Sequence, residues 1–271
     1  MCDADGDGAG DELVNCVMLT TWPIRRQMIH EAIISFTAQT YSPRTLTIVN
    51  DGAPCTLSAA FHARWSGRVV DVACGSSVGA KRNAAVSAVP HAQLIASFDD
   101  DDFSLPTRLE SNMTALGDGL WLSASRKLIA IDTLENVVGF ESGRCYGAGL
   151  VRAHVPRRLP WPQLNYLEDQ RLYEHFCREC ADGGSFSEEV SRMRGGGVVE
   201  DDALVYVHRR HAHNVSAPHR KELWQGVLPL ALAGEKEALR APEMVRRILN
   251  EHPTPYLEDV EVATHCIHTS V

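Results

Sequence analysis

Four consecutive aspartates, Asp99, Asp100, Asp101 and Asp102, directly follow the apolar run LIASF. Two unit charges about 6 Å apart repel by about 3 kcal/mol at the effective dielectric of a partly enclosed protein site. Mg²⁺ and Mn²⁺ suit such oxygen clusters, since they take one or two carboxylates and complete their coordination with water and substrate phosphates. One interpretation is therefore a divalent-cation site. The other is a solvated acidic loop with Asp102 as a helix cap, where the repulsion costs almost nothing.

Three more carboxylates lie where they could meet a ligand. Asp51 ends the run LTIVN and can accept a hydrogen bond from a nucleobase N–H, although a capping role in the turn IVNDG is the alternative. Glu168 and Asp169 begin a predicted helix, whose dipole favours ionised carboxylates. A carboxylate held ionised beside a reacting hydroxyl suits general-base catalysis. Ordinary acidic residues of a first helical turn are the alternative interpretation.

Basic and imidazole groups offer partners for phosphate or metal. The stretch GAKRNAAV opens a predicted helix, so that its first amides, Lys81 and Arg82 present positive potential to a diphosphate. It matches neither the dinucleotide-binding G-x-G-x-x-G pattern nor the Walker loop, and solvated helix residues are the alternative. His208, His211 and His213 could complete a metal shell or contact phosphate, or form a solvated polar turn.

The elements that must position these groups follow a regular alternation of short apolar strands and amphipathic helices. We predict strands at 13–21, 46–50, 68–73 and 94–98, with helices beginning near Pro23, Val78 and Pro106. This alternation is typical of βαβ crossovers and a mainly parallel sheet. Ligands bind beyond the carboxyl ends of such strands. We therefore expect convergence on one crevice of Thr20, Thr21, Asp51, residues 76–81 and residues 99–102.

The second half of the chain is less regular. Residues 121–132 and 136–140 predict strands or a hairpin, residues 167–180 a helix, and the segment after residue 217 two amphipathic helices. The glycines at 143, 147 and 149 indicate a loop with an unusual backbone or the close approach of a ligand.

Composition limits the class of protein. The chain has 271 residues, 44% of them hydrophobic, and a net charge of −9, which argues against a nucleic-acid scaffold that works by bulk electrostatics. No run of eighteen apolar residues predicts a membrane span. Several of the eight cysteines lie inside apolar runs, where a reduced thiol behaves as a small hydrophobe. We therefore expect a cytoplasmic protein without a membrane span.

Taken in order, these motifs resemble the family 2 glycosyltransferases of GT-A fold over about residues 13–216. The matching pieces are VMLTTWPIRR, EAIISFTAQTYSPRTLTIVNDGAP, VGAKRNAA and FDDDDFSLPTRLE, followed by LEDQRL and HRRHAHNVS. The resemblance implies an α/β fold with a mainly parallel nucleotide-binding sheet flanked by helices. It also implies a nucleotide-sugar half at 13–118 and an acceptor half at 119–216, between a flexible acidic tail at 1–12 and a helical extension at 217–271.

The resemblance implies a metal-dependent, inverting transfer of a hexosyl or N-acetylhexosaminyl group. The donor would be a nucleotide sugar, preferably a UDP-sugar, and the cofactor Mn²⁺ or Mg²⁺. A glycan or glycoconjugate is the expected acceptor, with a protein side chain or a modified nucleic-acid base as lesser alternatives. The alternative function is a catalytically inactive nucleotide-sugar-binding module, against which the retention of Asp101 and Asp169 argues.

Carried over by motif position, the resemblance also assigns roles. Asp169 would be the catalytic base, with Glu168 beside it. The nucleotide sugar would be bound by Thr20, Thr21, Asp51, Lys81, Arg82, Asn83, Asp99 and Asp100. The metal would be held by Asp101, Asp99 and His211. Two departures concern base recognition, because the first turn reads T-T-W-P where the family commonly has a Tyr-Asn pair, and Asn50 replaces the first aspartate of D-D-G.

Overall fold

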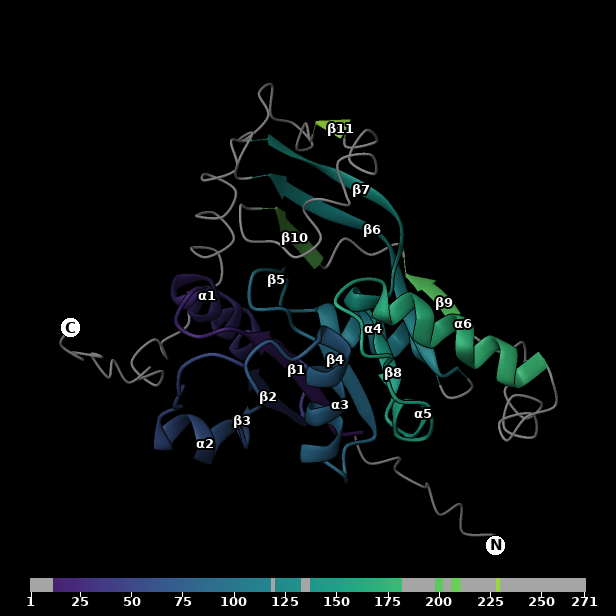
Figure 1. Cartoon of the computed structure of the whole chain (residues 1–271). Helices are drawn as coiled ribbons and strands as arrows, with labels where there is room; N and C mark the ends of the chain where they lie inside the picture. The colour runs from purple at the N-terminus through teal and green to yellow at the C-terminus, as the bar shows by residue number, and fades with distance from the viewer. Residues whose placement is uncertain are drawn as a thin grey trace, which may run out of the picture.

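The computed structural model describes residues 12–117, 120–132, 137–181, 198–201, 206–210 and 228–229. Within them one mixed sheet runs in the order β11-β7-β6-β8-β4-β1-β2-β3 (Figure 1). Four parallel strands form its N-terminal part: β1 (Val14–Thr20), β2 (Arg44–Asn50), β3 (Arg68–Asp71) and β4 (Leu94–Ser97). Helices connect them: α1 (Arg26–Thr37), α2 (Ala59–Trp65) and α3 (Val78–Ala88).

Both faces of the central strand β1 are covered, which explains its mostly apolar sequence; the buried Asn15 within it is hydrogen-bonded to Thr47 and to the carbonyl of Ala85. Cys16 and Met18 pack into a cluster with α1 and α2 that includes Phe36. Val17 and Leu19 point to the other face, in a cluster with residues of α3 and with Trp161. Successive side chains of a strand alternate between faces, so a strand buried on both sides is apolar at most positions.

Strand register brings the predicted ligand-binding residues to one edge of the sheet. Thr20 at the end of β1 lies opposite Asn50 at the end of β2. On the other side of β1, Val17 lies opposite Ser97, so Asp100 follows β4 at the level of Thr20. The carboxyl ends of three parallel strands therefore meet at one edge, where α/β sheets bind ligands.

The second half carries the antiparallel part of the sheet. Two long strands, β6 (Leu122–Asp132) and β7 (Val137–Cys145), form a pair that extends away from the parallel strands (Figure 1). Strand β8 (Leu150–Arg152) runs antiparallel to β4 and joins the two halves. The remaining elements are β5 (Phe103–Ser104), α4 (Arg108–Leu116), η1 (Tyr146–Ala148), α5 (His154–Arg158), α6 (Glu168–Ala181), β9 (Val198–Asp201), β10 (Tyr206–Arg210) and β11 (Leu228–Pro229).

The predicted fold class, an α/β sheet with a parallel half, flanking helices and a less regular second half, is confirmed. The helix predicted to begin near Val78 is confirmed as α3, which begins at that residue. Short α2, β8 and α5 were not predicted, because segments of three to seven residues carry little periodicity. Of the predicted C-terminal helical extension the structure describes only Leu228–Pro229, which form β11 and pair with β7; the rest of that segment lies outside the described residues. No helix in the described ranges combines the length and the apolarity that crossing a membrane requires.

Candidate functional site

The four aspartates lie in a buried loop after β4. Asp100, Asp101 and Asp102 are 0%, 7% and 6% exposed, and the side chain of Asp99 is 31% exposed. The alternative of a solvated acidic loop is therefore wrong. Asp102 is also not a helix cap, since α4 begins only at Arg108. The repulsion among these carboxylates is real and must be offset by other groups.

Arg25, in the turn between β1 and α1, is one such group. Its Nη1 donates to Oδ1 of Asp100 at 2.6 Å and to Oδ2 of Asp101 at 3.1 Å. Burial, followed by repulsion from Asp101, nevertheless raises the pKa of Asp100 to about 6, against the opposing effect of Arg25. Burial and the neighbouring carboxylates raise the pKa of Asp99 to about 7, although Arg82 opposes them. The loop is thus only partly neutralised by the side chains around it.

Asp102 ties the loop to β10 rather than facing a ligand. Its carboxylate accepts hydrogen bonds from the hydroxyl of Tyr206 and, at 2.7 Å, from the backbone N–H of Arg209. The guanidinium of Arg209 donates to the carbonyl of Asp101 at 2.8 Å and to Glu31 of α1 at 2.7 Å. Strand β10 therefore fixes the backbone that presents Asp99 and Asp101.

At the end of β2, Asp51 uses both of its carboxylate oxygens. Thr21 Oγ1 donates to Oδ1 at 2.6 Å, and Lys81 Nζ lies 3.1 Å from Oδ2. Asn50, which departs from the family pattern, holds the turn together: its Oδ1 accepts from the N–H groups of Trp22 and Gly52, both at 3.0 Å. The predicted residues Thr21, Asp51 and Lys81 therefore form one cluster, adjoining Thr20 at the end of β1.

The first turn of α3 does not offer its amides to a diphosphate, contrary to the sequence-based expectation. The N–H of Val78 donates to Asn165 Oδ1 at 3.1 Å, that of Gly79 to the carbonyl of Leu164 at 3.0 Å, and that of Ala80 to Ser77 Oγ at 3.2 Å. A Cβ on Gly79 would lie 1.8 Å from the carbonyl oxygen of Pro162, so the loop after α5 packs directly on this turn. The first amides of α3 therefore hold the loop at Leu164 and Asn165 in place.

Arg82 connects the aspartate loop to the start of α6. Its Nε donates to Glu168 Oε1 at 3.1 Å and its Nη2 to Asp169 Oδ2 at 3.3 Å, while the same Nη2 lies 3.9 Å from Asp99 Oδ1. Its Nη1 donates to Ser97 Oγ. Arg82 is 5% exposed, and although burial lowers the pKa of its guanidinium, the carboxylates around it produce a net rise. Burial and then Asp169 raise the pKa of Glu168.

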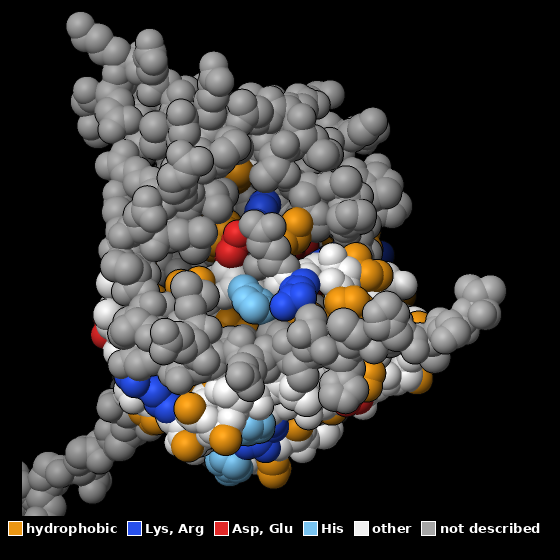
Figure 2. Space-filling model, turned by 90° about the vertical axis from the view of Figure 1, so that its left-hand side faces the viewer, with side chains coloured by type: hydrophobic (Ala, Val, Ile, Leu, Met, Phe, Trp, Pro, Cys, Tyr) orange, Lys and Arg blue, Asp and Glu red, His pale blue; other side chains and the backbone are white. Residues whose placement is uncertain are grey.

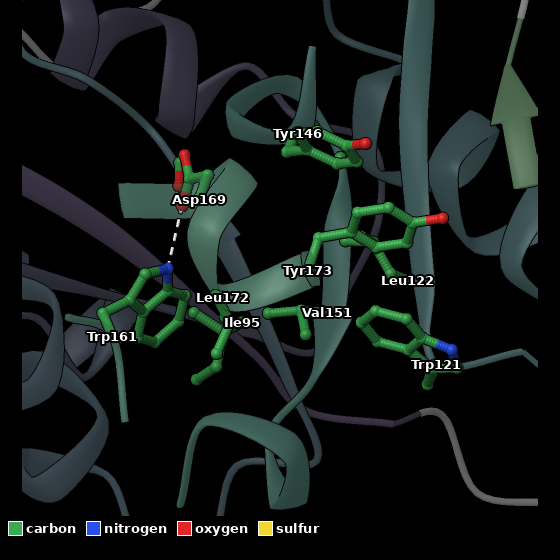
Figure 3. A pocket seen from close by; sticks show the side chains of 11 residues that line it. Ile95, Trp121, Leu122, Tyr146, Val151, Trp161, Asp169, Leu172 and Tyr173 are labelled. Atoms are coloured by element: carbon green, nitrogen blue, oxygen red, sulfur yellow. Dashed lines mark hydrogen bonds between the residues drawn. The ribbon is translucent and has the colours of Figure 1, made fainter. Parts of the chain in front are cut away.

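Asn83, predicted to approach the nucleotide, is bound to the backbone of Trp161 instead. Its Nδ2 donates to the Trp161 carbonyl at 2.8 Å, and its Oδ1 accepts from the Trp161 N–H at 2.9 Å. The Trp161 indole Nε1 in turn donates to Asp169 Oδ1 at 2.9 Å (Figure 3). Asn83 therefore fixes the backbone of Trp161, whose indole binds Asp169.

Asp169 lies at one end of a small, mostly apolar pocket between α6 and the sheet (Figure 3). Tyr173 stacks between Trp121 and Tyr146 along its other side, with ring centroids 5.9 and 5.2 Å apart. A Cβ on Gly147 would lie 3.4 Å from Asp169 Oδ2, so this glycine does mark a close approach. Most residues that line the pocket are buried and belong to the core cluster on this face of the sheet, so the packing of α6 against the sheet fixes the position of Asp169.

The aspartate loop is a possible metal site only together with a ligand that supplies more oxygens. In the parts of the chain that the structure describes, no group of three or more His, Cys, Asp or Glu side chains is arranged to hold a metal. Asp99 and Asp101 provide two carboxylates, the number that Mg²⁺ takes when phosphates complete its shell. Asp100 and Thr20 are buried side by side, and the Thr20 hydroxyl lowers the pKa of Asp100, so Asp99 and Asp101 remain the two carboxylates of the loop with exposed surface.

The predicted histidines contribute little that can be described. His208 is buried. Burial raises the pKa of Asp102, and the charge of His208 opposes that rise. His211 and His213 lie outside the described residues. Figure 2, which looks onto the left-hand side of Figure 1, shows acidic, basic and histidine side chains gathered in the middle of that face.

Sequence reasoning missed Arg25 and Trp161. Arg25 follows β1 within five residues, so the rule that selected Thr20 and Thr21 could have found it. Trp161 lies in a segment without regular secondary structure, and no pattern in the sequence indicates its contact with Asp169.

No protein-family profile and no curated protein sequence matches the chain. Among solved structures it is similar to S. aureus TarS, at 12% identity and a TM-score of 0.47, over 73% of this chain and 36% of that one. It is similar to TarS 1-349 in complex with UDP-GlcNAc, at 12% identity and 0.48, over 74% and 59%. It is also similar to M. tuberculosis glucosyl-3-phosphoglycerate synthase in complex with Mn²⁺, UDP and glucosyl-3-phosphoglycerate, at 15% identity and 0.48, over 75% and 74%. The chain spans less than two thirds of the TarS structures, and likenesses at these identities and TM-scores carry no conclusion about this chain.

Proposed function

We propose that this chain is a GT-A glycosyltransferase of the family 2 type. In this proposal it transfers a hexosyl or N-acetylhexosaminyl group from a UDP-sugar to an acceptor hydroxyl, with inversion and with Asp169 as the general base. The ordered sequence motifs support it. So does the edge of the sheet to which β1, β2 and β4 bring Thr20, Asp51 and Asp99.

One observation carries the proposal: a single buried guanidinium faces both the aspartate loop and the carboxylates of α6. Arg82 lies 3.9 Å from Asp99 and 3.3 Å from Asp169, which are 70 residues apart in the chain. A transferase needs the departing diphosphate and the base on either side of the sugar. Arg82 lies between Asp99, which the motifs assign to the sugar nucleotide, and Asp169, which they assign as the base.

On the donor side, Thr20, Thr21, Asp51 and Lys81 would contact the nucleoside, and Asp99 and Asp100 the sugar nucleotide. Asp101 and Asp99 would hold Mn²⁺ or Mg²⁺, with His211 as a further proposed ligand. A divalent ion bound there would neutralise charge on the departing diphosphate. Thr21 and Lys81 now contact the carboxylate of Asp51, and they would have to share this carboxylate with the nucleobase.

On the acceptor side, Asp169 would take the proton of the attacking hydroxyl. Trp161 and Arg82 each hold one of its oxygens, which fixes the orientation of the carboxylate. Glu168 beside it accepts from Arg82 Nε and would keep that guanidinium in place. The expected acceptor is a glycan or glycoconjugate, as the resemblance implies.

A donor screen tests the proposal. The protein is incubated with Mn²⁺ and each common nucleotide sugar, UDP-GlcNAc first, and nucleotide release is measured with acceptor mixtures. We expect release from one donor and a loss of about 100-fold or more in Asp169→Asn, the lower range for a general base. The matched control is Glu174→Gln, which makes the same carboxylate-to-amide change on the outer side of α6.

Two results would contradict the proposal. Donor binding without turnover under any acceptor mixture would favour the inactive binding module. Release that persists in Asp169→Asn would remove Asp169 from the role of base.

A further inference from the structure

Arg25 contacts Asp101, one of the carboxylates to which the proposed function assigns the metal ion. Its side chain is 17% exposed, and it reaches over the carboxylates of Asp100 and Asp101, whose side chains are 1% and 11% exposed. One nitrogen, Nη1, contacts both carboxylates, at 2.6 and 3.1 Å. A cation that bridges two neighbouring carboxylates resembles in its electrostatics a bound divalent ion.

The bridge neutralises the aspartate loop incompletely. The guanidinium of Arg25 contacts Asp100 and Asp101, while Asp99 and Asp102 lie close by and Arg82 lies 3.9 Å from Asp99. Asp100 is 0% exposed, so water does not screen its charge. A divalent ion would match the charge of this loop better than a single guanidinium does.

Arg25 and a divalent ion cannot both use the same oxygen of Asp101. The Oδ2 atom bound by Arg25 is one of only two oxygens that this carboxylate offers. Two cations at such a short distance also repel each other strongly at the low dielectric of a buried site. An ion that binds Asp101 in a regular coordination geometry must therefore displace Arg25 or bind weakly beside it.

We infer that Arg25 is a resident counter-cation that competes with the divalent ion for Asp101, so that metal binds well only together with a diphosphate. The inference rests on the proposed function, which supplies the diphosphate. Arginine binds phosphate oxygens through two parallel N–H donors, so a nucleotide diphosphate offers Arg25 a new partner as it leaves Asp101. Metal and nucleotide then favour each other's binding, and this coupling is reciprocal.

The neighbouring Arg26 provides a matched control. It is exposed, its guanidinium lies 5.9 Å from the centre of the Trp22 ring, and no contact to the aspartate loop involves it. Arg25→Gln and Arg26→Gln make the same change of net charge one residue apart. Any difference between these two variants therefore reports the bridge rather than the long-range field.

The test measures Mn²⁺ binding directly, by the electron paramagnetic resonance signal of the free ion, with and without UDP. We expect Arg25→Gln to bind Mn²⁺ alone about tenfold tighter than the unmodified protein, which corresponds to losing one competing charge-assisted hydrogen bond. UDP should strengthen Mn²⁺ binding about tenfold more in the unmodified protein than in Arg25→Gln. Arg26→Gln should match the unmodified protein in both measurements.

Equal Mn²⁺ affinities of Arg25→Gln and the unmodified protein, with and without UDP, would overturn the inference. Arg25→Gln leaves the buried Asp100 without its counter-charge, and this variant can fail to fold for that reason. In that case the double variant Arg25→Gln/Asp100→Asn, which removes both partners of the ion pair, takes its place. A tighter Mn²⁺ affinity of that double variant supports the inference, and an unchanged one refutes it. The proposed function fails separately, through the absence of turnover in the donor screen, while the competition for Mn²⁺ remains measurable.

Discussion

The indole Nε1 of Trp161 donates a hydrogen bond to Oδ1 of Asp169 at 2.9 Å. Trp161 is 4% exposed, and its own backbone is held at both polar atoms by the side chain of Asn83. The orientation of the proposed base thus depends on a chain of contacts that starts on α3 and passes through an irregular loop to α6. Separate predictions follow for each link.

Replacing Trp161 by Phe should lower kcat about tenfold while the KM for the donor stays within about twofold, since the lost hydrogen bond orients the base and does not touch the nucleotide. Steady-state kinetics with the donor identified by the screen give both values. Trp65→Phe, at the end of α2, controls for the loss of an indole elsewhere. A rise of KM alone would contradict a positioning role for Trp161.

Replacing Asn83 by Ala should reduce the free energy of unfolding by about 1–3 kcal/mol, because it leaves the N–H and C=O of Trp161 without their partner. Affinity for UDP should not change. Urea unfolding and calorimetric titration with UDP separate the two effects. A loss of UDP affinity at full stability would instead restore Asn83 as a nucleotide contact.

Replacing Arg82 by Gln should destabilise the fold by about 3 kcal/mol, since it leaves Glu168 and Asp169 without their shared counter-charge in a buried setting. Arg68→Gln, on β3 and away from the carboxylates, is the control for loss of an arginine. Thermal or urea unfolding at neutral pH provides the comparison. Equal stability of the two variants would show that Arg82 is not the group that joins the two halves of the site.

The stability of the metal-free protein should depend on Asp99. Burial and neighbouring carboxylates raise its pKa from 3.8 to about 7, so between about pH 4 and pH 7 the folded state binds more protons than the unfolded state. The contribution of Asp99 to stability therefore falls as the pH rises through this window. Unfolding in EDTA should show Asp99→Asn equal to the unmodified protein near pH 4 and about 1 kcal/mol more stable above pH 7, after allowance for solvent screening. A difference independent of pH would contradict the raised pKa.

The sequence allowed most of the parallel half of the fold to be predicted, because apolar strands alternate there with amphipathic helices. The run from Val14 to Thr20 is buried throughout, and the seven-residue strand β2 beside it is buried almost throughout. The same strand ends brought together Thr20, Asp51 and Asp99 as expected from parallel topology. The parallel direction and the neighbours of β1, β2, β3 and β4 are therefore confirmed.

Side-chain partners could not be predicted in the same way, because they depend on tertiary packing. The first amides of α3 were expected to face a phosphate, yet Leu164 and Asn165, more than 80 residues later, bind them. Nothing in the local sequence of α3 indicates that a distant loop would cover it. Asp102 was likewise ambiguous until β10 placed Tyr206 against it.

The most direct measurement is a crystal structure of the protein with Mn²⁺ and UDP. We predict the ion about 2.1 Å from a carboxylate oxygen of Asp101 and bound to the diphosphate, the uracil beside Asp51, and Asp169 across an open space from the metal. In that structure Arg25 should have left Asp101 for a phosphate oxygen. A nucleotide bound away from Asp51 and Asp101, with the bridge of Arg25 intact, would contradict the proposed site.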